Sequence, residues 1–133
     1  RANAVQLLGR FLYSIRDLDW QLVSIDGGNK RNAIAREAKA AIAAEEDTLD
    51  IINERLEAYS AEVAEEYGAI EKDIKVGTAE YNGERRVAID EMTAWNLVTA
   101  LCASPHGVLK MSQEIENFVE TSTNLASVTI RTS

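Results

Sequence analysis

Apolar residues recur at helical spacing in three segments of the chain. The first runs from Ala4 to Ile15, where the apolar side chains step by three and four positions. The second is a long stretch from Glu45 to about Lys72, and the third covers about Asp90 to Ala103. Because each segment keeps its apolar residues on one face, the pattern predicts three amphipathic helices.

The intervening segments favour strands. Residues 20–25 and 125–132 are rich in β-branched or aromatic residues, residues 74–78 alternate apolar and polar, and a short strand is expected at 108–111. Residues 36–44 are ambiguous. Their apolar and polar positions alternate with the period of a strand, whereas their many alanines favour a helix. The pattern alone leaves both structures open for residues 36–44.

The order of these elements indicates the fold class. Helices alternate with strands along the chain, which predicts an α+β fold with the helices packed on one face of a mostly antiparallel sheet. A length of 133 residues suits one domain with a single modest core. Since the chain begins at Arg1 rather than at a methionine, we expect it to be a piece of a longer protein.

The charge balance excludes two classes of partner. Fourteen basic and 22 acidic residues give a net charge of −8, which argues against binding to nucleic acid or to anionic lipid. No apolar run reaches the ~18–20 residues of a membrane span. Cys102 is the single cysteine, so no internal disulfide is possible and a reducing compartment is favoured.

The chain offers little that could catalyse a reaction. His106 is its one histidine, whereas a catalytic zinc ion normally needs three protein ligands. We expect Cys102 to be a small buried thiol, and the acidic runs Glu45–Asp47 and Glu65–Glu66 to lie on a solvated helix face. We therefore expect no catalytic residue and no metal site in this chain.

One polar, glycine-rich loop and two tryptophans remain. Two glycines let a backbone approach a ligand closely, an arginine can grip a carboxylate, and an amide can polarise a carbonyl. From the residues alone a plain turn is favoured, with a ligand-facing loop as the alternative. The loop consists of Gly27, Gly28, Asn29, Lys30, Arg31 and Asn32. The tryptophans, Trp20 and Trp95, are expected to fill the core rather than to line a pocket.

Three segments together resemble the lid domain of the aminoacyl-histidine (Xaa-His) dipeptidases. They are Arg1–Ala4 followed by an apolar helix, Val23–Ile34 with Arg36–Ala38 behind it, and Pro105–Val108 followed by Met111–Ser112 and Val119–Leu125. The matches extend through nearly the whole chain, and the second and third are specific. Two positions depart from the family pattern, since Ala35 stands where proline is usual and His106 where asparagine is usual.

The resemblance implies a cytoplasmic peptidase of two domains that hydrolyses Xaa-His and related dipeptides. Its catalytic domain, outside this chain, would hold two zinc ions, a bridging carboxylate and a glutamate base. Residues 1–133 would form one inserted lid or dimerisation domain, which contacts the catalytic domain, contributes to a homodimer and closes over a dipeptide substrate. Such a domain would be inactive by itself. A ferredoxin-like arrangement is implied, with its first strand upstream of Arg1.

The resemblance also changes the interpretation of the loop. With it, a substrate-facing loop at Gly27–Asn32 is favoured over a plain turn, and Asn32 is the best single candidate. Residues 20–25, 36–44 and 74–78 should then be strands of one sheet. The alternative function is a stand-alone helical interaction or assembly module, which explains the amphipathic helices and the acidic face but leaves the polar glycine loop unexplained.

Overall fold

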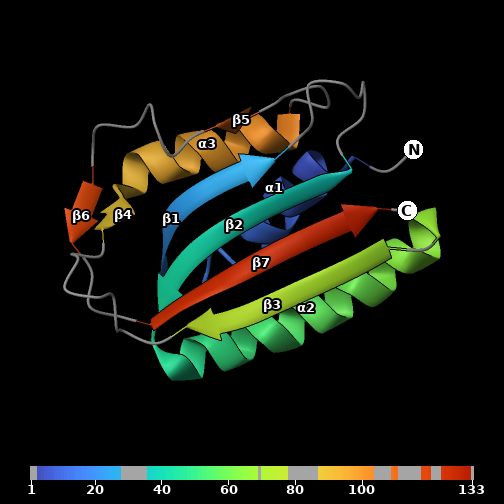
Figure 1. The fold of residues 1–133 in the computed structure, drawn as a ribbon, viewed down its shortest axis with the longest axis horizontal. Coiled ribbons are helices and arrows are strands. Elements are labelled where there is room, and N and C mark those ends of the chain that lie inside the picture. The colour runs from blue at the N-terminus through green and yellow to red at the C-terminus, as the bar shows by residue number, and fades with distance from the viewer. Residues whose placement is uncertain are drawn as a thin grey trace.

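The computed structural model describes residues 3–27, 36–68, 70–77, 87–103, 109–110, 118–120 and 124–132. The described helices are α1 (Ala4–Ser14), α2 (Glu46–Tyr67) and α3 (Glu91–Ala103). The described strands are β1 (Trp20–Gly27), β2 (Glu37–Ala44), β3 (Ile70–Gly77), β4 (Val87–Ile89), β5 (Leu109–Lys110), β6 (Phe118–Glu120) and β7 (Asn124–Thr132). Figure 1 shows how these elements are arranged.

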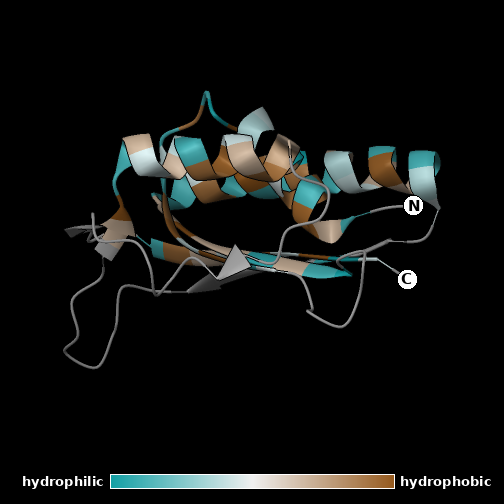
Figure 2. Ribbon diagram, turned by 90° about the horizontal axis from the view of Figure 1, so that it is seen from above, coloured by the Kyte–Doolittle hydropathy of each residue, from teal (hydrophilic) through white to brown (hydrophobic). Residues whose placement is uncertain are grey.

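The main sheet has five strands in the order β3-β7-β2-β1-β5, and every pair in it is antiparallel. A second, two-stranded sheet pairs β4 with β6. The helices all lie on one side of the main sheet (Figure 2). The prediction of an α+β fold, with helices on one face of an antiparallel sheet, is therefore confirmed.

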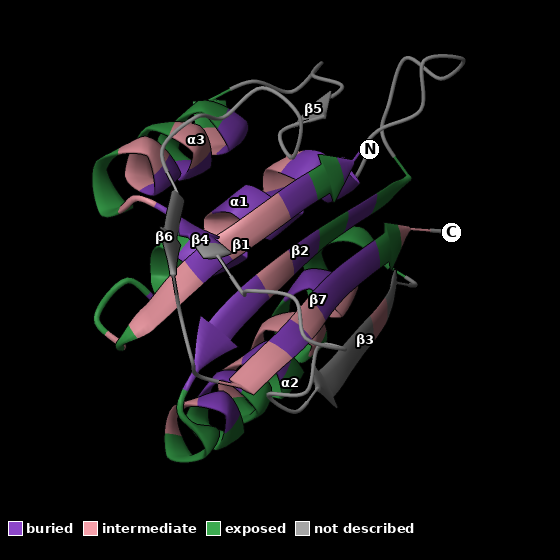
Figure 3. Ribbon diagram, turned by 60° about the vertical axis from the view of Figure 1, so that its left-hand side comes forward, coloured by how far each residue is buried: buried purple, intermediate pink, exposed green. Residues whose placement is uncertain are grey.

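The pattern left residues 36–44 open, and all of them except Arg36 form the strand β2. Ala38, Ala40, Ile42 and Ala44 are all buried, whereas the alternate residues Glu37 and Lys39 are exposed, as the colouring of Figure 3 shows along β2. Alanine is a weak strand former, but pairing with two neighbouring strands outweighs that preference in β2. β2 lies between β1 and β7, and small side chains on its inner face let the helix layer approach the sheet.

The strand β7 occupies a position that the sequence did not indicate. In a ferredoxin-like order the first strand of the motif lies between the strands that flank the second helix. Here those flanking strands are β2 and β3, and β7 lies between them, antiparallel to both. β7, near the C-terminal end of the chain, thus occupies the position in the sheet that we expected for a strand upstream of Arg1.

Helix α2 is shorter than the apolar pattern predicted. It ends at Tyr67 because Gly68 adopts a positive φ of 91°, a backbone conformation that residues with a Cβ rarely adopt. Ile70, which continued the apolar face of the predicted helix, instead begins β3. The strand predicted at 74–78 is confirmed over residues 74–77, whereas residue 78 lies outside the described residues, and the pattern did not indicate that the strand begins at Ile70.

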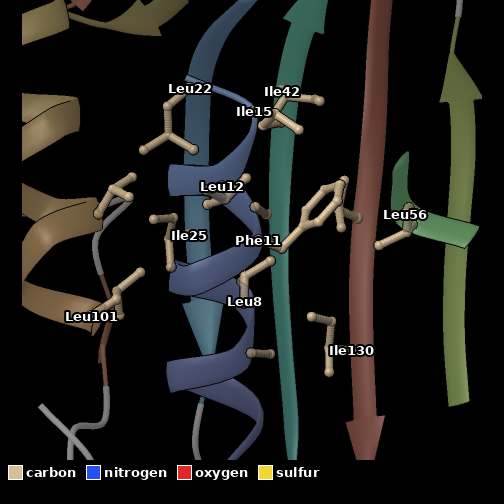
Figure 4. Packing of buried hydrophobic residues seen from close by; sticks show 14 of the residues in the cluster. Leu8, Phe11, Leu12, Ile15, Leu22, Ile25, Ile42, Leu56, Leu101 and Ile130 are labelled. Atoms are coloured by element: carbon tan, nitrogen blue, oxygen red, sulfur yellow. The ribbon is translucent and has the colours of Figure 1, made fainter. Parts of the chain in front are cut away.

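The core lies between the sheet and α1. One face of α1 carries Leu8, Phe11 and Leu12, and Ile15 follows directly after the helix. All four are fully buried against residues of the strands and of α2 and α3 (Figure 4). The Phe11 ring packs on Tyr59 of α2 with ring centroids 5.4 Å apart. Asn3 begins α1, since its side-chain Oδ1 accepts a hydrogen bond of 3.1 Å from the Gln6 backbone N–H.

Candidate functional site

The candidate substrate loop begins where β1 ends. β1 and β2 form a hairpin whose last described pair is Gly27 with Ala38. Gly28, Asn29, Lys30, Arg31 and Asn32 lie outside the described residues. The structure therefore fixes the strand from which the loop emerges, and the role of the loop itself stays a prediction.

Gly27 is buried, and its lack of a side chain has a packing reason. A Cβ at this position would lie 2.9 Å from Cγ2 of Val5 in α1 and 3.1 Å from the Ala38 Cβ. Glycine therefore lets the end of β1 approach both the helix and the neighbouring strand. We expected the glycine to admit a ligand, whereas its described contacts are with the protein itself.

The end of β1 also pairs with a strand from the region of the third segment of the resemblance. The short strand β5 pairs with the end of β1, with Leu109 opposite Gly27 and Lys110 opposite Asp26. The stretch Pro105–Val108, which includes His106, immediately precedes β5 but lies outside the described residues. On the other side of the hairpin, the Thr132 backbone N–H donates to the carbonyl of Arg36 over 2.9 Å. The last described residue before the loop, Gly27, thus pairs with a strand that directly follows Pro105–Val108 in the sequence.

Cys102 shows no sign of activation. Its side chain is only partly buried, and burial raises the pKa of the thiol, an effect that the nearby Arg10 partly offsets. The thiol is therefore protonated at neutral pH and is a weak nucleophile. The expectation of a small buried thiol is wrong, because Cys102 is only half-buried, at the edge of the contact between α1 and α3, where Gln6 Nε2 donates to its carbonyl over 3.1 Å.

The acidic face of α2 is solvated, as its spacing predicted. Glu45–Asp47 and Glu65–Glu66 are exposed. One basic residue of this helix, Arg55, forms a two-pronged ion pair with Asp17 in the turn after α1, with N–O distances of 2.7 and 2.9 Å. The hydrogen bonds from Arg55 lower the pKa of Asp17. This pair fastens α2 to the turn that leads into β1.

Within the described ranges, no three histidine, cysteine, aspartate or glutamate side chains converge in a way that could hold a metal ion. The described residues therefore offer no set of ligands for a zinc ion, and the two zinc ions that the resemblance implies were expected in the catalytic domain outside this chain. None of the described helices combines the length and the apolar character needed to cross a bilayer.

The sequence interpretation missed a cavity beside the two tryptophans. Trp20 and Trp95 do pack against the core, but both are only partly buried and both line a cavity between α3 and the start of β1. Trp20 is the first residue of β1 and Trp95 lies in the second turn of α3. The expectation that they only fill the core is wrong in this respect. Their separation in the sequence gave no signal that they would meet.

The chain is similar to known peptidases. Residues 1–68 match the family model M20_dimer, the peptidase dimerisation domain. Cytosol non-specific dipeptidase from Escherichia coli (strain K12) is 33% identical over 129 residues, which cover 96% of this chain and 26% of that protein. The chain thus spans about a quarter of the length of this curated relative. No solved structure matches it. By the match over 1–68, half of its length, the chain belongs to the M20 peptidase dimerisation-domain family.

Proposed function

We propose that this chain is the lid and dimerisation domain of a cytoplasmic metallodipeptidase that acts on Xaa-His and related dipeptides. The observation that carries the proposal is the likeness to cytosol non-specific dipeptidase, which extends over 96% of the chain. The relative's printed name supports a broad dipeptide preference, and the aminoacyl-histidine motifs Val23–Ile34 and Pro105–Val108 support histidine at the second position. The alternative of a helical module is disfavoured by the five-stranded sheet at the centre of the fold.

The direct test is a dipeptidase assay on the full-length parent protein with zinc, manganese or cobalt added. We expect hydrolysis of an Xaa-His dipeptide and slower hydrolysis of a tripeptide. An enzyme that cleaves neither with any of the three metals contradicts the proposal.

We assign the two zinc ions and the general base to the catalytic domain that the relative's additional length accommodates. In support, the described part of this chain brings no three suitable ligand side chains together. The isolated 133 residues should hydrolyse no dipeptide and lose added zinc on dialysis. Zinc retained in a one-to-one ratio, measured by atomic absorption, would place a metal site in this domain and overturn the assignment.

Within this proposal the loop Gly27–Asn32 faces the substrate. Its support is the position of Gly27 at the end of the hairpin, beside β5, which follows the His106 segment in the sequence. When the lid closes and excludes water, the Asn32 amide would donate a hydrogen bond to the scissile carbonyl as negative charge develops on it.

The test is Asn32→Ala in the full-length parent, with Asn53→Ala on the exposed face of α2 as a matched control. Removing one donor of this kind lowers kcat by about 10²–10³. We expect a loss of kcat that exceeds any rise in KM for Asn32→Ala, and near-normal kinetics for Asn53→Ala. Unchanged kcat with a lowered melting temperature would assign Asn32 to the scaffold of the hairpin instead.

We further place the homodimer contact along β3. This eight-residue strand pairs with β7 on one side, and no strand in the described part of the chain pairs on its other side. An open edge presents backbone N–H and C=O groups that a second copy could pair with. Amide hydrogen exchange in β3 should slow as the protein concentration rises, together with a dimer mass by light scattering. A dimer whose β3 exchange is independent of concentration would locate the contact elsewhere.

A further inference from the structure

A cavity of about 350 Å³ lies between the turn after α1 and the first turns of α3. Its inner wall is apolar and buried, and it consists of Leu22 of β1, Ile89 of β4, and Ala94 and Val98 of α3. Cavities of roughly 300–1,000 Å³ with an apolar wall and a few polar groups are typical of small-molecule sites. This volume is at the lower end of that range, so a matching ligand is small.

Two tryptophans form an aromatic corner in the cavity. The rings of Trp20 and Trp95 lie edge to face, with centroids 5.6 Å apart and an interplanar angle of 75°. The Trp20 indole N–H donates to the Ile15 carbonyl over 2.8 Å, which fixes the orientation of that ring. Since both side chains line the cavity and are only partly buried, part of each ring is available to a ligand.

The mouth of the cavity carries an excess of negative charge. Asp19 and Glu91 line it, both are exposed, and neither forms an ion pair with another residue in the described ranges. Arg16 also lines the mouth, but its guanidinium lies 4.0 Å from the centroid of the Tyr13 ring and donates to the Tyr13 carbonyl over 2.9 Å. Among the described residues that line the cavity, Arg16 is the only cation, and it is engaged with its own turn of the chain.

We propose that this cavity binds a small organic cation, an ammonium group that carries short apolar substituents. The faces of tryptophan rings attract a cation that lies within about 6 Å of the ring centre, and two rings set at an angle can contact it from two sides. The apolar wall accommodates the substituents, and the carboxylates of Asp19 and Glu91 favour positive over negative ligands. An anion would meet two carboxylates at the mouth, and a neutral apolar molecule would gain nothing from them.

The site is separate from the proposed substrate loop. Trp20 begins β1 and Gly27 ends it, so the cavity and the start of the loop lie about 23 Å apart along the strand, at the usual rise of ~3.3 Å per residue. Failure of the dipeptidase proposal would therefore leave this inference intact, and the reverse also holds.

The chain supplies its own reporter for the test. Trp20 and Trp95 are the two tryptophans of the 133 residues, so all tryptophan fluorescence comes from the cavity. We would titrate the chain with choline and with tetramethylammonium, and compare 3,3-dimethylbutan-1-ol, an uncharged molecule of the same shape as choline. We expect a saturable change in emission with both cations, and an affinity for them that falls with added salt. The dissociation constant of the alcohol should be about tenfold larger or more.

Variants then test the residues. Glu91→Gln should weaken cation binding about twofold to fivefold, as expected for an exposed charge, while the circular dichroism spectrum stays unchanged. Glu46→Gln is the matched control, because Glu46 is also the exposed first residue of its helix but lies outside the cavity. Trp95→Leu should weaken binding about fivefold or more, followed through the remaining Trp20 signal.

Several results would overturn the proposal. Equal affinity for choline and for the uncharged alcohol would show a plain apolar cleft. If Glu91→Gln and Glu46→Gln weakened cation binding to the same extent relative to the unsubstituted chain, the effect would be one of general charge and not of the cavity. No saturable change with either cation would show that the cavity does not bind this class of ligand.

Discussion

Gly9 lies where α1 crosses α3, and replacing it with alanine tests how closely the two helices pack. An added Cβ would lie 2.6 Å from the Leu101 Cβ and 3.1 Å from the Cys102 backbone nitrogen. Neither neighbour is the far end of a flexible side chain, so the helices themselves would have to separate by roughly 1 Å to reach ordinary contact distance.

Two opposing effects set the size of the change. Alanine is favoured over glycine inside a helix by about 1 kcal/mol, so propensity alone predicts stabilisation. Overpacking a tight core contact costs about 1–3 kcal/mol, and this site belongs in the upper part of that range because backbone must move. The net expectation is a loss of about 1–2 kcal/mol. For a chain of this length that loss lowers the melting temperature by about 4–8 °C.

The assay is thermal unfolding followed by far-ultraviolet circular dichroism, with urea unfolding as a second measurement. Ala61→Gly, at an exposed position of α2, measures the helix propensity difference without any tight contact and should lower stability by about 1 kcal/mol. The reasoning is refuted if Gly9→Ala raises the melting temperature by about as much as Ala61→Gly lowers it, because the contact between α1 and α3 would then be loose.

Two further predictions concern the sheet and α2. Ile42→Asp should leave the chain unfolded by circular dichroism, because Ile42 is fully buried and an unpaired charge there has no partner, whereas Ala41→Asp on the opposite face should cost about 1 kcal/mol or less. Burial raises the pKa of Tyr59, whose hydroxyl donates to the Leu7 carbonyl over 2.8 Å, to about 12. Above pH 10 the unfolded chain loses that proton first, so stability should fall between pH 10 and about 12, and Tyr59→Phe should flatten that fall in pH-dependent melting curves.

Local pattern was sufficient where one face of an element is buried. The apolar stripe of α1 corresponds to the face that the structure buries, because periodicity reports directly which face meets a core. The apolar pattern predicted a helix that continues past Gly68, since Ile70 has helical spacing. The positive φ of Gly68 ends α2 before that residue. Spacing alone does not encode such a stop.

Features that depend on distant residues could not be predicted in this way. The ambiguity of residues 36–44 is resolved by the strands on either side of β2, one of which comes from the far end of the chain. The cavity forms because Trp20 and Trp95, in different elements, are brought within 5.6 Å by the packing of α3 beside β1. The sequence suggests that Gly27 lets a ligand approach the backbone. Its close contact with Val5 depends on how α1 packs against the sheet, which the local sequence does not reveal.

The position of β7 has a consequence for how the domain folds. Arg131 and Glu37 form an ion pair of 2.9 Å although they lie 94 positions apart in the sequence, so the centre of the sheet closes only after a long loop has closed. Such non-local pairing is typical of folding on the millisecond-to-second scale rather than in microseconds. A nascent chain that has emerged only as far as α3 would hold β2 and β3 as two unjoined edges, both prone to pairing with other chains. Synthesis of the last strand is therefore the step that protects this domain from aggregation.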